Sequence, residues 1–314
     1  MILEKATQPT MYFIGVTTGS SSIMKVFPKW AKALGFENAV MKGIDIAIHE
    51  KPEVYREVVQ FLKDDPLSLG ALVTTHKIDL FNAAHDLFDV EGTYAKQFGE
   101  ISSIYKDGDK FCCDAKDPIT CGMAMEEYVP ENYWKNNPEA GVFIMGAGGS
   151  CISMCSYYMR NFSKENSPAK IVVCNRSRAR LEELQHINDK FYPGTIPAEY
   201  YLTPEPGQND AQMAKMGKGS LVINATGLGK DRPGSPLTDA AVFPENALVW
   251  ELNYRGERKF MHQALAQADS RGVTVIDGWM YYIYGWTQVI ADVFHTEILG
   301  ERLKEMSRIA AEVN

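Results

Sequence analysis

The sequence predicts an α/β protein with two domains, each built around a parallel sheet. Short apolar runs alternate with helix-length amphipathic segments through most of the chain. A glycine-rich turn separates one of these runs, Val142–Met145, from the helix-length segment that follows it. The length of 314 residues and a hydrophobic content of 45% are enough for two cores of ordinary size.

The first part of the chain is expected to form a parallel βαβαβ unit. Strands are expected at 11–16, 39–46 and 70–75, and helices at 23–34, 52–63 and 78–87. In the second helix Val54, Val58, Phe61 and Leu62 recur at helical spacing, so one face is apolar. Alternation of strands with helices indicates parallel pairing. The first strand ends in a small polar loop, 15–22, whose hydroxyls could face a ligand.

Lys77 stands just after the third strand, at the edge where open α/β sheets bind their ligands. A helix N-terminus disfavours added positive charge, so a lysine there can exchange protons near neutrality. Next, Asp107-Gly108 between two β-prone runs predicts a hairpin, which brings Asp117 to its far end. Asp117-Pro118 then starts a helix reaching 128, and 130–138 is interpreted as a linker. Taken singly, Lys77 is more simply a surface lysine and Asp117 a helix cap.

The turn after Val142–Met145 is the strongest functional signal. It leads into a helix-length segment, 151–160, and then into a second apolar run, 171–174. Glycines let the backbone approach a pyrophosphate, and the free N–H groups at the helix start face its charge. Although Cys151 replaces the third glycine of the usual pattern, this context predicts a Rossmann-type, doubly wound dinucleotide-binding domain at 139–277. The alternative is an ordinary tight turn.

The residues after the second strand of this domain indicate which dinucleotide binds. A site that prefers NAD has an Asp or Glu there, whereas this chain has Asn175, Arg176, Ser177 and, further on, Arg180. Guanidinium groups suit a 2′-phosphate, so NADP(H) is the predicted cofactor. For any one arginine, a solvated position at a helix start is the competing interpretation.

Prolines and glycines disturb the pattern over 186–219, which is interpreted as a decorated crossover with one β-prone patch. Strands are then expected at 220–225, 247–252 and 273–277, and helices at 259–268 and 280–303. The first two of these strands end in polar loops that are candidates for the cofactor crevice. The last helix is apolar enough to pack back onto the first domain, so that domain is expected to comprise 1–138 and 278–314.

Composition excludes several classes of function. The net charge is −8 without a basic tract, which argues against nucleic acid as a partner. No apolar run approaches the ~20 residues of a membrane span, so a cytoplasmic protein is expected. Six cysteines occur without a C-x-x-C pair and are interpreted as buried thiols in a reducing compartment. The histidines lack paired spacing, so no metal site is predicted.

Taken together and in order, these motifs resemble the shikimate dehydrogenase family. The segment 73–77 is similar to its V-T-x-P-x-K motif without the proline, and Lys77 falls on the catalytic lysine. The segment 115–117 stands where the family has N-T-D, so Asp117 takes the place of the acid that partners the lysine. On this resemblance the substrate would contact Ser20, Ser22, Thr74, Ser102, Tyr254, Tyr284 and Gln288. The cofactor would contact Gly146, Ala147, Gly148, Gly149, Ser150, Asn175, Arg176, Ser177, Arg180, Thr226 and Gly278.

Two departures from the family pattern concern the substrate. Ser102 replaces an asparagine of the G-A-x-N-T motif, and the expected glutamine after the D-G-x-x-M motif is Tyr284, with Gln288 one turn later. The resemblance implies an NADP(H)-dependent dehydrogenase that interconverts 3-dehydroshikimate and shikimate in aromatic amino acid biosynthesis. Alternatives are a dehydrogenase for quinate or another cyclic hydroxy acid, and a catalytically silent NADP-binding regulatory protein.

The resemblance also implies an architecture. Lys77 would supply the proton, and Asp117 would orient the ammonium group of Lys77. The active site would lie in a cleft between the two domains. A small-molecule acid is the expected partner, and the protein is expected to be a monomer or a homodimer.

Overall fold

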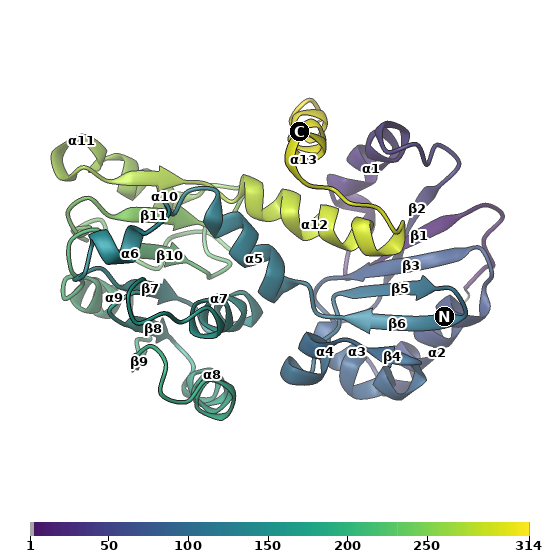
Figure 1. The fold of residues 1–314 in the computed structure, drawn as a ribbon, viewed down its shortest axis with the longest axis horizontal. Coiled ribbons are helices and arrows are strands. Elements are labelled where there is room, and N and C mark those ends of the chain that lie inside the picture. Colours follow the sequence, from purple (N-terminus) through teal and green to yellow (C-terminus); the bar gives the residue numbers. More distant parts are fainter. Residues whose placement is uncertain (1–2, 231, 314) are drawn as a thin grey trace. The chain divides into compact units, whose positions relative to one another are not determined.

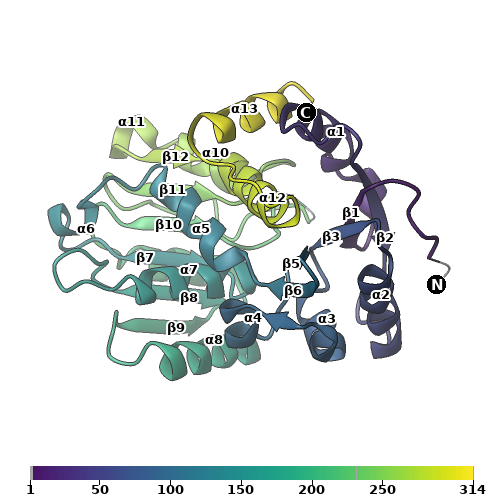
Figure 2. The same ribbon diagram turned by 45° about the vertical axis from the view of Figure 1, so that its right-hand side comes forward.

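A computed structural model describes residues 3–230 and 232–313. The chain forms two compact units: unit 1 comprises Met1–Lys116 and Gly285–Asn314, and unit 2 comprises Asp117–Tyr284. Each unit contains one six-stranded sheet with helices packed on it (Figures 1 and 2). The predicted α/β class is therefore confirmed.

Unit 1 contains a mixed sheet with the strand order β2-β1-β3-β5-β6-β4. Its strands are β1 (Thr10–Gly15), β2 (Val40–Asp45), β3 (Ser68–Val73), β4 (Val90–Glu91), β5 (Ser103–Asp107) and β6 (Lys110–Asp114). The expected parallel βαβαβ arrangement is confirmed, because β1 pairs in parallel with both β2 and β3. The expected hairpin is also present: β5 and β6 pair antiparallel around Gly108, whose φ is +59°.

The helices of unit 1 bury the apolar faces that the sequence pattern predicts. They are η1 (Thr18–Ser20), α1 (Ile23–Ala33), α2 (Pro52–Asp64), α3 (Lys77–Ala84), η2 (His85–Leu87), α4 (Thr93–Phe98) and α13 (Gly300–Ala311). Val58 and Leu62 of α2 are buried against Ile14 of β1 and Val73 of β3 in one apolar cluster. Helices α1 and α13 lie side by side, where Trp30 Nε1 donates to Met306 O at 2.8 Å (Figures 1 and 2).

Unit 2 contains a parallel sheet with the strand order β12-β11-β10-β7-β8-β9. Its strands are β7 (Val142–Met145), β8 (Ile171–Asn175), β9 (Ala198–Leu202), β10 (Leu221–Asn224), β11 (Leu248–Glu251) and β12 (Thr274–Ile276). Its helices are α5 (Asp117–Glu126), α6 (Tyr133–Asn136), α7 (Gly149–Arg160), α8 (Arg178–Phe191), α9 (Pro206–Met213), α10 (Lys259–Leu265) and α11 (Ala268–Arg271), together with the start of α12 (Trp279–Val293). This is the doubly wound order, and the strand order reverses between β7 and β10.

The region 186–219 does more than decorate a crossover. It contains the end of α8, then β9, which pairs in parallel with β8 as the outermost strand, and then α9. Helix α9 begins with a capping box between Glu205 and Gln208 and a proline at its first turn. The segment therefore supplies one of the six strands of the sheet. The linker expected at 130–138 contains the short helix α6.

The prediction of a single last helix at 280–303 is wrong. The chain forms α12 (Trp279–Val293) and, after a turn, α13 (Gly300–Ala311). His295 adopts φ +48° and Gly300 φ +54°, which are left-handed conformations that a continuous helix cannot contain. Side-chain contacts fix the turn, since Gln288 Nε2 donates to Ile298 O at 3.1 Å and His295 Nε2 lies 2.7 Å from Lys106 O.

The units divide at Lys116/Asp117 and at Tyr284/Gly285, whereas the sequence places the domain boundaries at 138/139 and 277/278. Helix α5 belongs to unit 2 because it packs closely on α7: a Cβ added to Gly122 would lie 2.3 Å from the Tyr157 ring. All six cysteines are buried and free, as predicted. No helix in the described part of the chain is long and apolar enough to cross a membrane.

Candidate functional site

In unit 1 the polar loop after β1 is held by an acidic residue that the sequence analysis missed. Asp45, the last residue of β2, accepts hydrogen bonds from Thr18 N at 2.8 Å and from Thr18 Oγ1 at 2.6 Å. A Cβ added to Gly43 would lie 1.9 Å from Thr18 Oγ1, so glycine is required for this approach. The loop presents Ser20 as an exposed residue and Ser22 as a half-buried one at the carboxyl edge of the sheet. The signal that could have identified Asp45 in the sequence is an acidic residue at the end of the strand that pairs with β1.

Thr74, Lys77 and Ser102 come together beside this loop. Thr74 N and Oγ1 both donate to Ile14 O, at 3.0 and 3.2 Å, so Thr74 is fixed next to the end of β1. Lys77 is the first residue of α3, and its carbonyl accepts from Ile101 N at 3.1 Å. Ser102 O accepts from Val73 N at 2.9 Å. The carboxyl ends of β1 and β3 therefore gather these predicted residues on one edge.

The Ser102 side chain is buried, and its role differs from that of a residue turned toward a substrate. Its hydroxyl accepts from the backbone N–H of Lys116 at 2.7 Å. Lys116 immediately precedes Asp117 in the chain, and its Nζ pairs with Asp292 Oδ1 at 2.8 Å. Ser102 therefore stabilises the segment that leads to Asp117.

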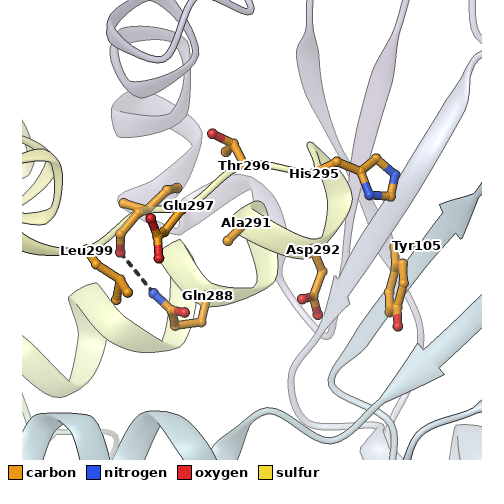
Figure 3. A pocket seen from close by; sticks show the side chains of 9 residues that line it. Tyr105, Gln288, Ala291, Asp292, His295, Thr296, Glu297 and Leu299 are labelled. Carbon is orange, nitrogen blue, oxygen red and sulfur yellow. Dashed lines mark hydrogen bonds between the residues drawn. The ribbon is translucent and has the colours of Figure 1, made fainter.

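Gln288 lies apart from this group. It lines a cavity of about 400 Å³ with Tyr105, Asp292, His295 and Glu297 (Figure 3), and its amide nitrogen, Nε2, donates to Ile298 O. None of the residues Ser20, Ser22, Thr74 and Lys77 lines this cavity. Burial raises the pKa of Tyr105 to about 12, so its phenol stays protonated at neutral pH.

In unit 2 the glycine turn lies at the point where the strand order reverses. Gly146 follows β7 with φ +104°, and a Cβ there would lie 2.7 Å from Ala225 O in the loop after β10. Gly148 caps α7, and a Cβ added there would meet no atom within 4 Å. The backbone at the start of α7 can therefore be approached closely at Gly148, at the point where the strand order reverses, which suits a pyrophosphate. Ala147 is buried within the turn, and Gly149 is the first residue of the helix.

Two residues that follow the glycines have partners inside unit 2. Ser150 Oγ and Tyr281 OH lie 2.9 Å apart, so this hydroxyl is already engaged. Cys151, which replaces the third glycine, is completely buried. Burial raises its pKa well above the ordinary value, so it is a packing residue and no nucleophile.

The segment after β8 has no acidic residue, as read from the sequence. Asn175 Nδ2 donates to Ser177 O at 3.1 Å, which closes the turn before α8. Arg176 is exposed at this turn. Arg180 is also exposed but pairs with Glu183 Oε2 at 2.8 Å, so a phosphate would have to compete with that carboxylate.

The ends of β10 and β11 carry a buried polar network that includes Thr226. Thr226 N and Oγ1 donate to Asn224 Oδ1 at 3.1 and 2.6 Å, and Asn224 Nδ2 donates to both Glu251 oxygens at 3.0 Å. Burial raises the pKa of Glu251 to about 7, although bonds from Asn253 and Asn224 oppose the shift. Glu251 was not among the predicted site residues. Gly278 lies close by, because a Cβ there would be 2.1 Å from Leu252 O.

The remaining predicted residues all lie in unit 2. The Tyr254 ring packs on Tyr282, with centroids 4.5 Å apart, and Lys230 Nζ lies 5.5 Å from its centroid. Tyr284 is buried, and its hydroxyl donates to Glu127 Oε1 at 2.5 Å. Asp117 is the first residue of α5. Within residues 3–230 and 232–313, no three His, Cys, Asp or Glu side chains gather as metal ligands would.

Comparison with known proteins gives a consistent result. No protein-family model matches the chain. Shikimate dehydrogenase (NADP(+)) of Bartonella henselae is 21% identical over 280 residues, which is 88% of this chain and 84% of that protein. The enzyme of the same name from Mesorhizobium japonicum is 23% identical over 254 residues, covering 81% and 79%.

Among solved structures, shikimate 5-dehydrogenase from Listeria monocytogenes, in complex with shikimate and NAD, superimposes with a TM-score of 0.73 at 17% identity. The match covers 98% of this chain and 99% of that one. Quinate dehydrogenase from Corynebacterium glutamicum gives a TM-score of 0.72 at 17% identity, over 96% and 98% of the chains. The chain is thus similar in sequence to shikimate dehydrogenases (NADP(+)) over most of its length, and it has the fold of shikimate and quinate dehydrogenases.

Proposed function

We propose that this protein is an NADP(H)-dependent oxidoreductase that interconverts 3-dehydroshikimate and shikimate. The likeness to shikimate dehydrogenases (NADP(+)) over most of the chain is the observation that carries this proposal. Unit 1 binds the hydroxy acid, and unit 2 binds the dinucleotide.

The residues of unit 2 fit a bound NADP(H). The open N-terminus of α7 beside Gly148 can accept the pyrophosphate. The exposed Arg176 can bind the 2′-phosphate, where an acidic residue would repel it. When bound, the cofactor supplies or accepts the hydride.

The residues of unit 1 support the recognition of a hydroxy acid. Ser20 and Ser22 lie on a loop fixed by Asp45, and their hydroxyls are of the type that binds a carboxylate. Ser20 Oγ donates to Thr17 O at 3.1 Å and would have to exchange that bond for one to the carboxylate. Thr74 lies beside that loop and can bind a ring hydroxyl. Lys77 transfers the proton that must leave the hydroxyl oxygen when a hydride leaves its carbon, and it returns the proton in the reductive direction. Asp117, the first residue of α5, is assigned as the acid that acts with Lys77 by its place in the motif series.

Shikimate and quinate are the two acids to test, each with NADP⁺ and with NAD⁺ in steady-state turnover assays. Turnover of shikimate with NADP⁺ is the expected result. Preferred turnover of quinate, which carries an additional ring hydroxyl, would change the substrate assignment. Dinucleotide binding without turnover of either acid would support a silent NADP-binding protein and contradict the proposal.

A further inference from the structure

A buried carboxylate at the end of β11 has no role in the chemistry described above. Glu251 is completely buried, and its oxygens accept hydrogen bonds from two asparagines. Asn224 Nδ2 donates to both of its oxygens at 3.0 Å, and Asn253 donates through its backbone N–H at 2.9 Å and through Nδ2 at 2.7 Å. Such a set of donors fits an ionised carboxylate, because a carboxylic acid would direct its own proton at an N–H group.

The carboxylate fixes the orientation of the Asn224 amide, and that amide holds the next loop. With Nδ2 directed at Glu251, Oδ1 faces Thr226 and accepts from its N–H and its hydroxyl. The Thr226 hydroxyl in turn accepts from Leu228 N at 3.2 Å, and Leu228 O accepts from Asn253 Nδ2 at 3.0 Å. The loops after β10 and β11 are therefore closed by a set of bonds centred on Glu251.

These loops also contact the glycines of the proposed cofactor site. Gly146 packs against Ala225, and Gly278 packs against Leu252 and Asn253 so closely that a Cβ at either glycine would overlap backbone atoms. Four strand-end segments of unit 2, after β7, β10, β11 and β12, therefore depend on the positions of the two loops.

We propose that Glu251 is the positioning residue that, when ionised, fixes Thr226 and the strand-end loops for dinucleotide binding, so that its protonation weakens binding. This inference rests on the proposed function, because it takes unit 2 as the NADP(H) site. Protonation of Glu251 and binding of the cofactor then oppose each other.

The direction of the pH effect follows from the environment of Glu251. Burial raises its pKa to about 7, while Arg258, at the start of α10, favours the ionised form. Arg258 Nη1 in turn lies 3.9 Å from Oδ2 of Asp277, the residue that follows β12. Glu251 is thus ionised above about pH 7, where affinity is highest, and is protonated progressively as the pH falls through that value. By linkage, cofactor binding near pH 7 releases protons.

The first test compares Glu251→Gln with the wild type and with Glu199→Gln. In glutamine the amide oxygen can still accept from Asn253 and Asn224 at the position of Oε1, but the NH₂ group at the position of Oε2 opposes Asn224 Nδ2, so the Asn224 amide is no longer held in the orientation that serves Thr226. Glu199 is a matched control, since it is a carboxylate of the same sheet, on β9 at the outer edge, bonded to Lys170 and Tyr201.

The dissociation constant of NADP⁺ is measured by calorimetry between pH 6 and 8.5. We expect it to rise about fivefold or more in Glu251→Gln at pH 8 and to lose the wild-type pH dependence that remains in Glu199→Gln. The 2′-phosphate titrates in all samples, so the difference between variants isolates the protein group. Unchanged affinity and pH dependence in Glu251→Gln would overturn the inference.

Two further measurements separate failure of this inference from misfolding of the variant and from failure of the proposed function. In the cofactor-free protein, hydrogen exchange over 225–229 should be faster in Glu251→Gln, because the amides of Thr226 and Leu228 lose their acceptors. If the variant does not fold, proton release on binding of NAD⁺, which lacks the 2′-phosphate, decides the question in the wild type: none near pH 7 would overturn the inference. A wild type that binds neither dinucleotide would instead refute the proposed function.

Discussion

At the scale of single residues, the proposed chemistry depends on Lys77. If Lys77 transfers the proton, Lys77→Ala should lower kcat by about 10²–10⁴, the usual contribution of a positioned acid–base group. Affinity for NADP(H) should stay nearly unchanged, because Lys77 belongs to unit 1. Steady-state kinetics and an equilibrium titration measure both quantities.

Lys51, an exposed lysine that precedes α2, is the matched control, and Lys51→Ala should keep full activity. If Asp117 acts together with Lys77, Asp117→Asn should also lower turnover, and the double variant should be little worse than the more damaging single one. Full activity of Lys77→Ala would leave the chain with the family's fold and without its chemistry.

Arg176 should decide which cofactor is used. A guanidinium bound to a 2′-phosphate contributes about 1.5–3 kcal/mol, so Arg176→Ala should lower kcat/KM for NADP⁺ by about 10- to 100-fold and leave that for NAD⁺ almost unchanged. Arg178→Ala removes an exposed arginine two positions along, the first residue of α8, and should not change the preference. An unchanged ratio in Arg176→Ala would refute the phosphate clamp.

The residues that the sequence analysis missed act through other residues. Asp45 and Glu251 each stand at the end of a strand and hold a loop that carries predicted site residues. A motif identifies residues that contact a ligand, because the ligand fixes their type and spacing. It says little about a carboxylate that holds a neighbouring loop through hydrogen bonds and does not itself contact the ligand. Ser102 illustrates the same limit, since only the structure shows that its hydroxyl holds Lys116 N.

At the scale of elements, the glycine turn gives a matched pair of substitutions. Gly146→Ala introduces a Cβ at φ +104° and within 2.7 Å of Ala225 O, so it should destabilise the protein by about 1–3 kcal/mol. Gly148 has φ −91° and open space around it, so Gly148→Ala should leave the melting temperature nearly unchanged.

Gly148→Ala should instead weaken the binding of the cofactor. The new methyl group of Gly148→Ala lies where the pyrophosphate must approach the start of α7, so NADP(H) affinity should fall although the fold is intact. Thermal melts and equilibrium titrations of both variants check the pair. Wild-type affinity in Gly148→Ala would show that the phosphate binds elsewhere.

Elements with a local signal could be predicted from the sequence, and those fixed by distant contacts could not. Strands β7 and β8 are continuous apolar runs, and the β5–β6 hairpin has an Asp-Gly step, so their positions follow from short segments. The break between α12 and α13 has a weaker signal, because the segment contains no proline and Gly300 is its single helix-breaking residue. That turn is fixed by Gln288 and by the contact of His295 with Lys106, which lies far away in the sequence.

At the scale of the whole molecule, the chain has one continuous unit and one discontinuous unit. Unit 2 is a single stretch with six parallel strands and its own apolar cluster, which includes Phe143, Phe243 and Phe260. Unit 1 is completed only by the C-terminal segment, 285–314. The exact division could not be predicted, because α5 joins unit 2 through packing at Gly122.

This asymmetry predicts how the two units fold when separated. The fragment 117–284 should unfold cooperatively, and NADP⁺ at 100 times its dissociation constant should stabilise it by about 2.7 kcal/mol. The fragment 1–116 should not unfold cooperatively by itself, because it lacks Trp286, whose ring centroid lies 4.9 Å from that of Phe13, and Met306, whose carbonyl accepts from Trp30.

Joining 285–314 to 1–116 through a flexible linker is the control for that fragment. It restores the partners of Phe13 and Trp30 and should restore a cooperative transition, measured by differential scanning calorimetry. A cooperative transition in 1–116 alone would show that the C-terminal segment only covers a domain that is already stable. In that case the apolar face of α1, with Val26, Phe27 and Trp30, would have to be buried by residues 1–116 themselves, although in the full chain Trp30 is bonded to α13.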